Sequence, residues 1–156
     1  MIEIEIPDYR KITLENLVCD YNGTLAIRGS LINGVDKILK KLSKTLKIYV
    51  ITGNTYGRIS KKLKETGCEI IILNENAQSQ QKLDFINQIS AESVVAIGNG
   101  RNDILMVKHS ALGIAVLQEE GAAKDLILEA DIVVKDINSA LSLLLHPIRL
   151  KASLRG

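Results

Sequence analysis

The chain has 156 residues, about the length of one domain. With 46% hydrophobic residues, 24% charged residues and a net charge of +2, its composition is typical of a folded globular protein. Only 3% of the residues are aromatic, so few rings are present to stack on bases, and we do not expect a nucleic-acid partner. Mild basic clusters are interpreted as solvated helix faces and a basic tail, at 37–47, 61–64 and 149–155.

No apolar run is long enough to cross a bilayer, and residues 1–6 alternate apolar and acidic side chains, unlike a signal peptide. We therefore expect a cytoplasmic protein with no membrane partner. Cys19 and Cys68 form no CxxC pair and are expected to be free, buried thiols, which fits a reducing compartment. His109 and His146 lack metal-ligand spacing and are expected to be structural or exposed.

Short apolar runs alternate with segments of helical periodicity along most of the chain. A strand pair is predicted at 1–6 and 11–13, and a small hairpin or flap at 25–32. The other predicted strands are 17–19, 46–51, 69–73, 94–97, 112–116 and 132–134. The predicted helices are 35–44, 55–65, 80–89, 103–109, 122–128 and 139–145. Pro147 is expected to end the last helix and to open the basic tail.

This alternation predicts an α/β fold, a doubly wound, mostly parallel, Rossmann-like sheet with helices on both faces. We expect a single domain over residues 1–156. Its core is expected at about 14–134, its N-terminal strand pair at 1–13, and its C-terminal helix and basic tail at 137–156.

Three predicted strands end in polar residues, and ligands of such sheets bind beyond the carboxyl ends of the strands. The first strand is followed by Asp-Tyr-Asn-Gly-Thr (20–24), the second by Thr-Gly-Asn (52–54) and the third by Gly-Asn-Gly-Arg-Asn-Asp (98–103). Lys82 lies on the helix predicted before the third strand. Each motif alone has a simpler interpretation as a turn, a Gly-rich loop or a surface lysine, but their joint order and spacing favour one catalytic site.

With these motifs, the sequence resembles the haloacid dehalogenase-like superfamily over roughly residues 14–134. Members have a nucleophile motif Asp-x-Asp-x-Thr/Val, a Ser/Thr after the second strand, a Lys and a terminal acidic motif. The phosphorylation domain of P-type ATPases is especially similar, because its Gly-Asp-Gly-x-Asn-Asp and Ile-Gly-Ile-Ala correspond to 98–103 and to Leu-Gly-Ile-Ala at 112–115. The resemblance implies a soluble phosphohydrolase that depends on Mg²⁺ and works through an aspartyl phosphate.

The resemblance also implies a role for each polar residue, with Asp20 as the nucleophile. The implied catalytic set is Asp20, Thr52 and Lys82. The implied phosphate-binding set, supplemented by the N-terminus of the following helix, is Gly23, Thr52, Gly53, Asn54 and Lys82. The implied Mg²⁺ ligands, all oxygen donors, are Asp20, the backbone carbonyl of Asn22, Asn99 and Asp103. In the family pattern the Asp103 position often acts through water or holds the lysine.

Two substitutions depart from the family pattern. Asn22 replaces the aspartate that protonates the leaving group and later activates water, a contribution of roughly 10²–10⁴-fold, so hydrolysis of the aspartyl phosphate should be slow. Asn99 replaces a second aspartate, which should lower metal affinity. The alternative function is a non-catalytic, phosphate- or nucleotide-binding regulatory protein that kept the fold. A receiver-like signalling domain fits the motifs poorly.

The spacing leaves no room for an inserted cap domain. The intervals Asp20 to Thr52 and Thr52 to Lys82 span 32 and 30 positions, and each already contains a helix and a strand. An independent domain needs at least about 50 residues. We therefore expect an open site, covered by a phosphorylated macromolecule or by a neighbouring subunit around a small phosphorylated substrate. The segments outside the core favour a homo-oligomer.

Overall fold

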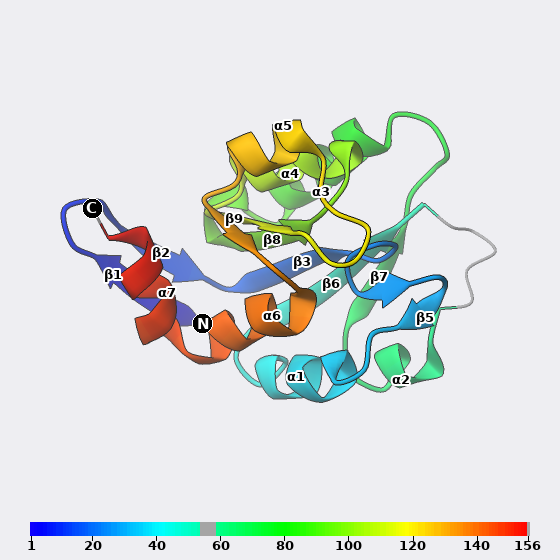
Figure 1. Cartoon of the computed structure of the whole chain (residues 1–156), viewed down its shortest axis with the longest axis horizontal. Coiled ribbons are helices and arrows are strands. Elements are labelled where there is room, and N and C mark those ends of the chain that lie inside the picture. Colours follow the sequence, from blue (N-terminus) through cyan, green and yellow to red (C-terminus); the bar gives the residue numbers. More distant parts are fainter. Residues whose placement is uncertain (54–58, 156) are drawn as a thin grey trace.

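The structure, a computed structural model, describes residues 1–53 and 59–155. Its centre is a six-stranded sheet in which all paired strands run parallel, in the order β10-β9-β8-β3-β6-β7. The strands are β3 (Asn16–Asp20), β6 (Lys47–Thr52), β7 (Glu69–Ile72), β8 (Val94–Gly98), β9 (Leu112–Val116) and β10 (Ile132–Val134). The predicted fold class is confirmed by this sheet and by the helices on its two faces (Figure 1).

The strand order reverses at β3. After β3 the chain adds β6 and β7 on one side, and then crosses to add β8, β9 and β10 on the other. Asp20 is the last residue of β3, where it pairs with Ile51 of β6, and the preceding Cys19 pairs with Ile97 of β8. A crevice forms at such a reversal because the two flanking connections leave in opposite directions, so ligands of open parallel sheets bind there.

Helices cover both faces of the sheet because its strands are apolar on both sides (Figure 1). In β3, Leu17 and Cys19 enter one hydrophobic core and Val18 enters the other. The first core contains α1 (Val35–Leu42) and α6 (Ile137–Leu145), and the second contains α3 (Gln78–Gln88), α4 (Ile104–His109) and α5 (Lys124–Glu129). Because helices pack on both faces of the sheet, each strand end is held in place and presents its polar residue in a fixed direction.

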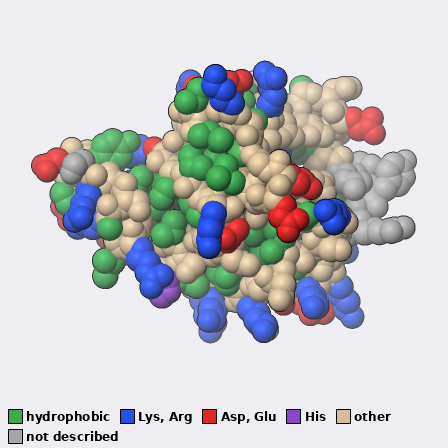
Figure 2. All heavy atoms as spheres, in the orientation of Figure 1, with side chains coloured by type: hydrophobic (Ala, Val, Ile, Leu, Met, Phe, Trp, Pro, Cys, Tyr) green, Lys and Arg blue, Asp and Glu red, His purple; other side chains and the backbone are tan. Residues whose placement is uncertain are grey.

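Smaller elements surround this framework. The strands β1 (Ile2–Ile6) and β2 (Arg10–Leu14) form an antiparallel hairpin, and β4 (Ala26–Ile27) and β5 (Ser30–Leu31) form the predicted flap. Short helical turns are η1 (Ala91–Ser93), η2 (Arg101–Asp103) and α2 (Lys61–Lys64). No helix in the described ranges has the length and apolar character needed to cross a membrane. The lysines of α1 and α2 are exposed along one side of the molecule, as expected for solvated helix faces (Figure 2).

Two predicted segments differ from the structure. The segment after Pro147, expected to be a basic tail, forms helix α7 (Pro147–Leu154), which packs against β1 through the buried Leu150. Proline does end α6, but it also starts a new helix, because its missing N–H has no intrahelical partner in a first turn. The helix predicted at 55–65 begins outside the described residues. Within them it spans only Lys61–Lys64.

The cysteines are free thiols, as predicted. Cys19 is fully buried in the core, and burial raises the pKa of its thiol well above the ordinary range. Cys68 was expected to be buried but is only partly so, because the edge strand β7 begins directly after it. Burial is also the main cause that raises the pKa of Cys68.

The packing of α7 can be tested with two substitutions on the same helix. We expect Leu150→Ala to lower the free energy of unfolding by about 2–5 kcal/mol, because the side chain is 0% exposed and its loss leaves a cavity. Ile148→Ala should change it by less than about 0.5 kcal/mol, because Ile148 is 84% exposed. Urea denaturation of both variants measures the difference, and equal effects would contradict the packing of this helix on β1.

Candidate active site

A buried ion cluster lies at the strand reversal. The Lys82 Nζ of α3 lies 2.8 Å from Asp20 Oδ1 and 2.6 Å from Asp103 Oδ1. Lys82 is 1% exposed, Asp20 is 7% exposed and Asp103 is 0% exposed. Buried charges are tolerated when they are paired and hydrogen-bonded, and one cation here serves two carboxylates. The structure thus brings together three sequence-predicted residues that lie far apart in the chain.

Burial and mutual repulsion set the ionisation of this cluster. Burial first, and then the negative charge of Asp103, raises the pKa of Asp20 to about 7, although Lys82 and the Thr24 hydroxyl oppose the rise. Burial alone would lower the pKa of Lys82, but the two carboxylates outweigh it and raise that pKa above its usual value. Lys82 therefore stays a cation, whereas burial and the charge of Asp103 favour the neutral form of Asp20.

Asp103 has both carboxylate oxygens engaged. Oδ1 accepts from Lys82, and Oδ2 accepts from the backbone N–H groups of Asn99 (3.0 Å) and Gly100 (2.9 Å). Direct metal ligation by Asp103 stays a prediction, beside the alternative in the family pattern in which this position holds the lysine. In this arrangement Asp103 holds Lys82 and fixes the loop that carries Asn99.

The turn after the nucleophile is held against this loop. Gly23 has φ +80°, and a Cβ added there would lie 2.6 Å from Asn99 Nδ2, so a side chain would not fit. Its N–H donates to the Ala26 carbonyl at 2.7 Å. The role of Gly23 as a phosphate donor stays a prediction, and its amide is used within the turn in this structure. The role that the geometry supports is the close approach of the two loops.

Thr24 is a site residue to which the sequence reasoning assigned no role. Its buried Oγ1 lies 3.4 Å from both Asp20 Oδ2 and Asn99 Oδ1, so the hydroxyl can donate to either oxygen. The signal was present in the sequence, since Thr24 is the last residue of the nucleophile motif. Thr24 therefore links the nucleophile to the third strand-end loop.

A cavity of about 420 Å³ opens beside Asp20. Besides Asp20 it is lined by two glycines, Gly53 and Gly100, and by four carboxamides. The carboxamide residues are Asn22, Gln78, Asn99 and Asn102. Asn22 is exposed, at the position where the family has its acid–base residue. The described lining therefore offers one carboxylate among neutral groups that can both donate and accept hydrogen bonds.

The second strand-end loop contributes to the same cavity through Gly53. A Cβ on Gly53 would lie 2.0 Å from Gln78 Nε2, so a larger residue would displace the Gln78 amide from its present position. Gln78 also accepts a hydrogen bond from Asn102 Nδ2 at 3.1 Å. Sequence reasoning missed Gln78, although it precedes Lys82 by one helical turn and hence shares its helix face. Thr52 ends β6 and is buried, while Asn54 lies outside the described residues.

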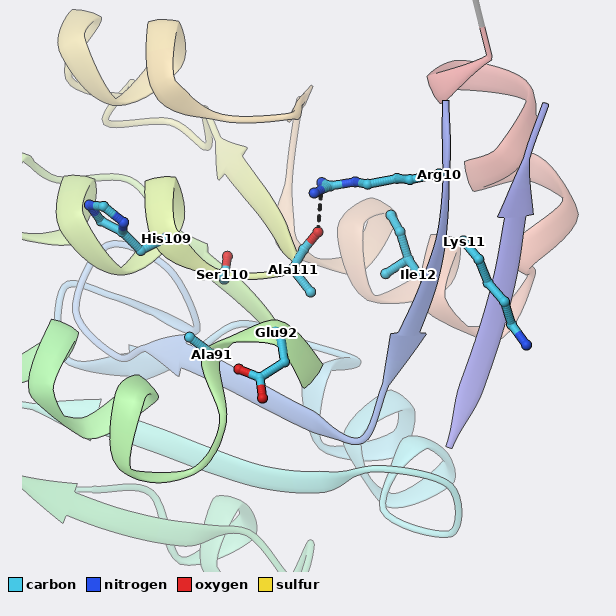
Figure 3. A pocket seen from close by; sticks show the side chains of 8 residues that line it. All are labelled: Arg10, Lys11, Ile12, Ala91, Glu92, His109, Ser110 and Ala111. Carbon is cyan, nitrogen blue, oxygen red and sulfur yellow. Dashed lines mark hydrogen bonds between the residues drawn. The ribbon is translucent and has the colours of Figure 1, made fainter. Parts of the chain in front are cut away.

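A second hollow of similar volume, about 420 Å³, lies at the amino ends of β8 and β9 (Figure 3). There Arg10 donates to the Ala111 carbonyl at 2.8 Å (Figure 3). Arg10 also lies 3.4 Å from Asp131. Arg10, Glu92 and His109 are exposed. Because this hollow contains no buried charge cluster, the cavity beside Asp20 is the better candidate for an active site.

The strand reversal, the buried lysine and the terminal carboxylate define an α/β protein built around a single candidate carboxylate nucleophile. Comparison with known proteins is consistent with this class. The model of the haloacid dehalogenase-like hydrolase family matches residues 77–140. An uncharacterized protein of Methanocaldococcus jannaschii is 50% identical over 78 residues, which are 47% of this chain and 84% of that protein.

A soluble P-type ATPase-like phosphatase of the same organism is 23% identical over 138 residues, 86% of this chain but only 50% of that protein. The chain therefore spans half the length of this relative. Among solved structures, the 3-deoxy-D-manno-octulosonate 8-phosphate phosphatase of Moraxella catarrhalis superposes with a TM-score of 0.70 at 15% identity, over 85% of this chain and 86% of that one. Residues 77–140 of the chain thus match the haloacid dehalogenase-like family, in agreement with the resemblance of the sequence motifs.

The importance of the buried cation can be tested by Lys82→Met. We expect the free energy of unfolding to fall by about 3–5 kcal/mol, because two carboxylates lose their buried counter-charge. Lys108→Met is the matched control. Lys108 pairs with Glu129 at 3.1 Å, but both side chains are more than a third exposed, so its loss should cost at most about 1 kcal/mol. Similar melting temperatures for the two variants would contradict the account.

Proposed function

We propose that this protein is a phosphohydrolase that depends on a divalent cation and forms an aspartyl phosphate on Asp20. At the level of enzyme class, the family model is that of a hydrolase, and the similar proteins with assigned names include phosphatases. The observation that carries the proposal is the buried Lys82, which pairs with Asp20 and Asp103 directly beside an open, polar cavity. A carboxylate held in this way is an activated nucleophile next to space for a substrate.

The residues around Asp20 suit a hard cation such as Mg²⁺. Among the described residues, no group of three or more acidic, histidine or cysteine side chains could hold a metal. A site here would use Asp20 with the Asn22 carbonyl, Asn99 Oδ1 and Asp103, the last directly or through water, and Mg²⁺ typically binds through one or two carboxylates with water and phosphate oxygens. The bound cation would neutralise phosphate charge. The M. catarrhalis phosphatase was solved in complex with magnesium and phosphate ions.

The residues around the cavity each have a defined part in the proposed reaction. An Asp20 oxygen attacks phosphorus, the bond to the leaving group breaks, and Lys82 balances the charge on the nucleophile and the transferred group. The neutral amides of Gly53, Gln78 and Asn102 can orient the substrate. Asn22 can neither donate an acidic proton to the leaving group nor remove one from water. Good leaving groups should therefore react, and the aspartyl phosphate should be long-lived.

We propose a small phosphorylated compound or a phosphorylated end of a macromolecule as the substrate. Between Asp20 and Thr52 the chain forms only β4, β5, α1 and β6, so that interval contributes no cap domain over the cavity. A single domain over residues 1–156, a cytoplasmic location and a homo-oligomer stay predictions. The second candidate function, a non-catalytic phosphate-binding regulator, is favoured by Asn22 and Asn99 at positions where the family has acids.

Replacement of the nucleophile tests the proposal. We expect Asp20→Asn to abolish Mg²⁺-dependent phosphate release from acetyl phosphate and p-nitrophenyl phosphate, because an amide cannot form the acyl phosphate. Asp84→Asn, an exposed position on α3, is the control and should retain the wild-type rate. If the wild-type protein binds phosphate and Mg²⁺ but releases no more phosphate than the Asp20 variant, the regulatory function replaces the catalytic one.

Restoration of the family's acid–base residue gives an independent test. Asn22→Asp should raise turnover of an alkyl phosphate by roughly 10²–10⁴-fold, because that leaving group needs a proton. The gain should be smaller for p-nitrophenyl phosphate, whose leaving group is a weak base. Steady-state kinetics on both substrates measures the ratio, with the exposed Asn87→Asp as the control. An equal rate in Asn22→Asp and wild type would refute our explanation of slow turnover.

A further inference from the structure

The loop between β9 and α5 (residues 117–123) also reaches the active site. The N–H of Ala123 donates to the Asn99 carbonyl at 2.9 Å, and the Asn99 side-chain amide lies 3.5 Å from the Gly121 carbonyl. No motif of the sequence pointed to this loop. It therefore contacts the third strand-end loop at Asn99.

Gln118 is the residue of this loop that reaches the nucleophile turn itself. Its Nε2 donates to the Thr24 carbonyl, 94 positions away in the sequence. Its Oε1 accepts from the N–H of Ile137, the first residue of α6, at 3.3 Å. The side chain therefore bridges the turn after Asp20 to the start of a helix, and both ends of its amide are used.

The backbone of Gln118 is held in a conformation that favours this bridge. Its φ is +55°, a left-handed value that residues other than Gly, Asn and Asp rarely adopt. The hydrogen bonds between β9 and β10 continue into the residues that follow both strands. The Leu117 N–H donates to the Val134 carbonyl at 3.0 Å, and the Gln118 N–H donates to the Lys135 carbonyl at 2.8 Å. The sheet edge thus anchors Gln118 while its side chain crosses to the site.

We propose that Gln118 is a positioning residue that fixes the turn carrying Asn22 and Thr24, and through it the orientation of Asp20. The path has two steps. Gln118 Nε2 donates to the Thr24 carbonyl. Thr24 Oγ1 then lies 3.4 Å from Asp20 Oδ2 and 3.4 Å from Asn99 Oδ1. Gln118 is not among the residues that line the cavity, so it acts through the turn and not on the substrate. This inference rests on the proposed function only for its effect on turnover.

Two variants separate the contributions of the bridge. Gln118→Gly removes the whole side chain and suits the positive φ, so it tests the bridge without added backbone strain. Gln118→Glu keeps an acceptor for the Ile137 N–H but removes the donor to Thr24. Gln88→Glu, at an exposed position of α3, is the matched control. If the contact with Thr24 is the one that matters, both variants at 118 should behave alike and differ from the control.

Hydrogen–deuterium exchange gives the readout that does not depend on activity. The amides of residues 23–26 are hydrogen-bonded within the turn, and we expect their exchange to become at least about tenfold faster in both variants, with β3 and β8 unchanged. Unaltered exchange in the turn, or faster exchange spread evenly over the molecule, would overturn the proposal, since the second result indicates general destabilisation.

Kinetics on p-nitrophenyl phosphate completes the experiment. We expect kcat to fall by about ten- to a hundredfold with KM nearly unchanged, because misplacement of the nucleophile slows chemistry while the lining residues outside the turn, such as Gly53, Gln78 and Asn102, stay in place. If the wild-type protein shows no turnover but the variants exchange faster in the turn, the positioning contact is supported and the proposed function is refuted. Wild-type turnover with no change in kcat or exchange at position 118 would refute the positioning role alone.

Discussion

The buried contact of Lys82 with Asp20 and Asp103 is the interaction on which the site depends. It joins the ends of β3 and β8 to α3, so three chain segments must be correctly packed before the charges can meet. One cation against two carboxylates leaves a net negative cluster, and a divalent cation or a transferred phosphoryl group changes that balance directly. The same contact therefore couples the stability of the fold to the proposed chemistry.

The parallel sheet places this cluster where a substrate can reach it. Because β6 and β8 flank β3 on opposite sides, their following loops separate at Asp20 and leave the polar cavity between them. Around this opening, hydrogen bonds to backbone groups hold the loops: two backbone N–H groups donate to the Asp103 carboxylate, and the Thr24 carbonyl accepts from Gln118. Such a frame can keep Asn22 and Asn99 in place without adding charge.

Sequence reasoning predicted the architecture and the main pairings well, because strand ends in a parallel sheet meet at one edge. Asp20, Lys82 and Asp103 could be placed in this way from motif order. It failed where the outcome depends on tertiary partners. Helix α7 requires the β1–β2 hairpin to bury Leu150. The positions of Gln78, Thr24 and Gln118 depend on contacts across 24 to 94 residues. The nucleophile motif and the helix face of Lys82 gave a signal for Thr24 and Gln78, but no local pattern indicated Gln118.

The most direct test of the account is to capture the phosphorylated enzyme. The protein is mixed with acetyl phosphate and Mg²⁺, quenched in acid, digested and analysed by mass spectrometry. We predict one phosphoryl group on the peptide that contains Asp20, removed by hydroxylamine, absent in Asp20→Asn and less abundant in Asn22→Asp because the restored acid speeds its hydrolysis. A wild-type protein that releases phosphate while this peptide stays unmodified, or that carries the phosphoryl group on another residue, would contradict the assignment of Asp20 as the nucleophile.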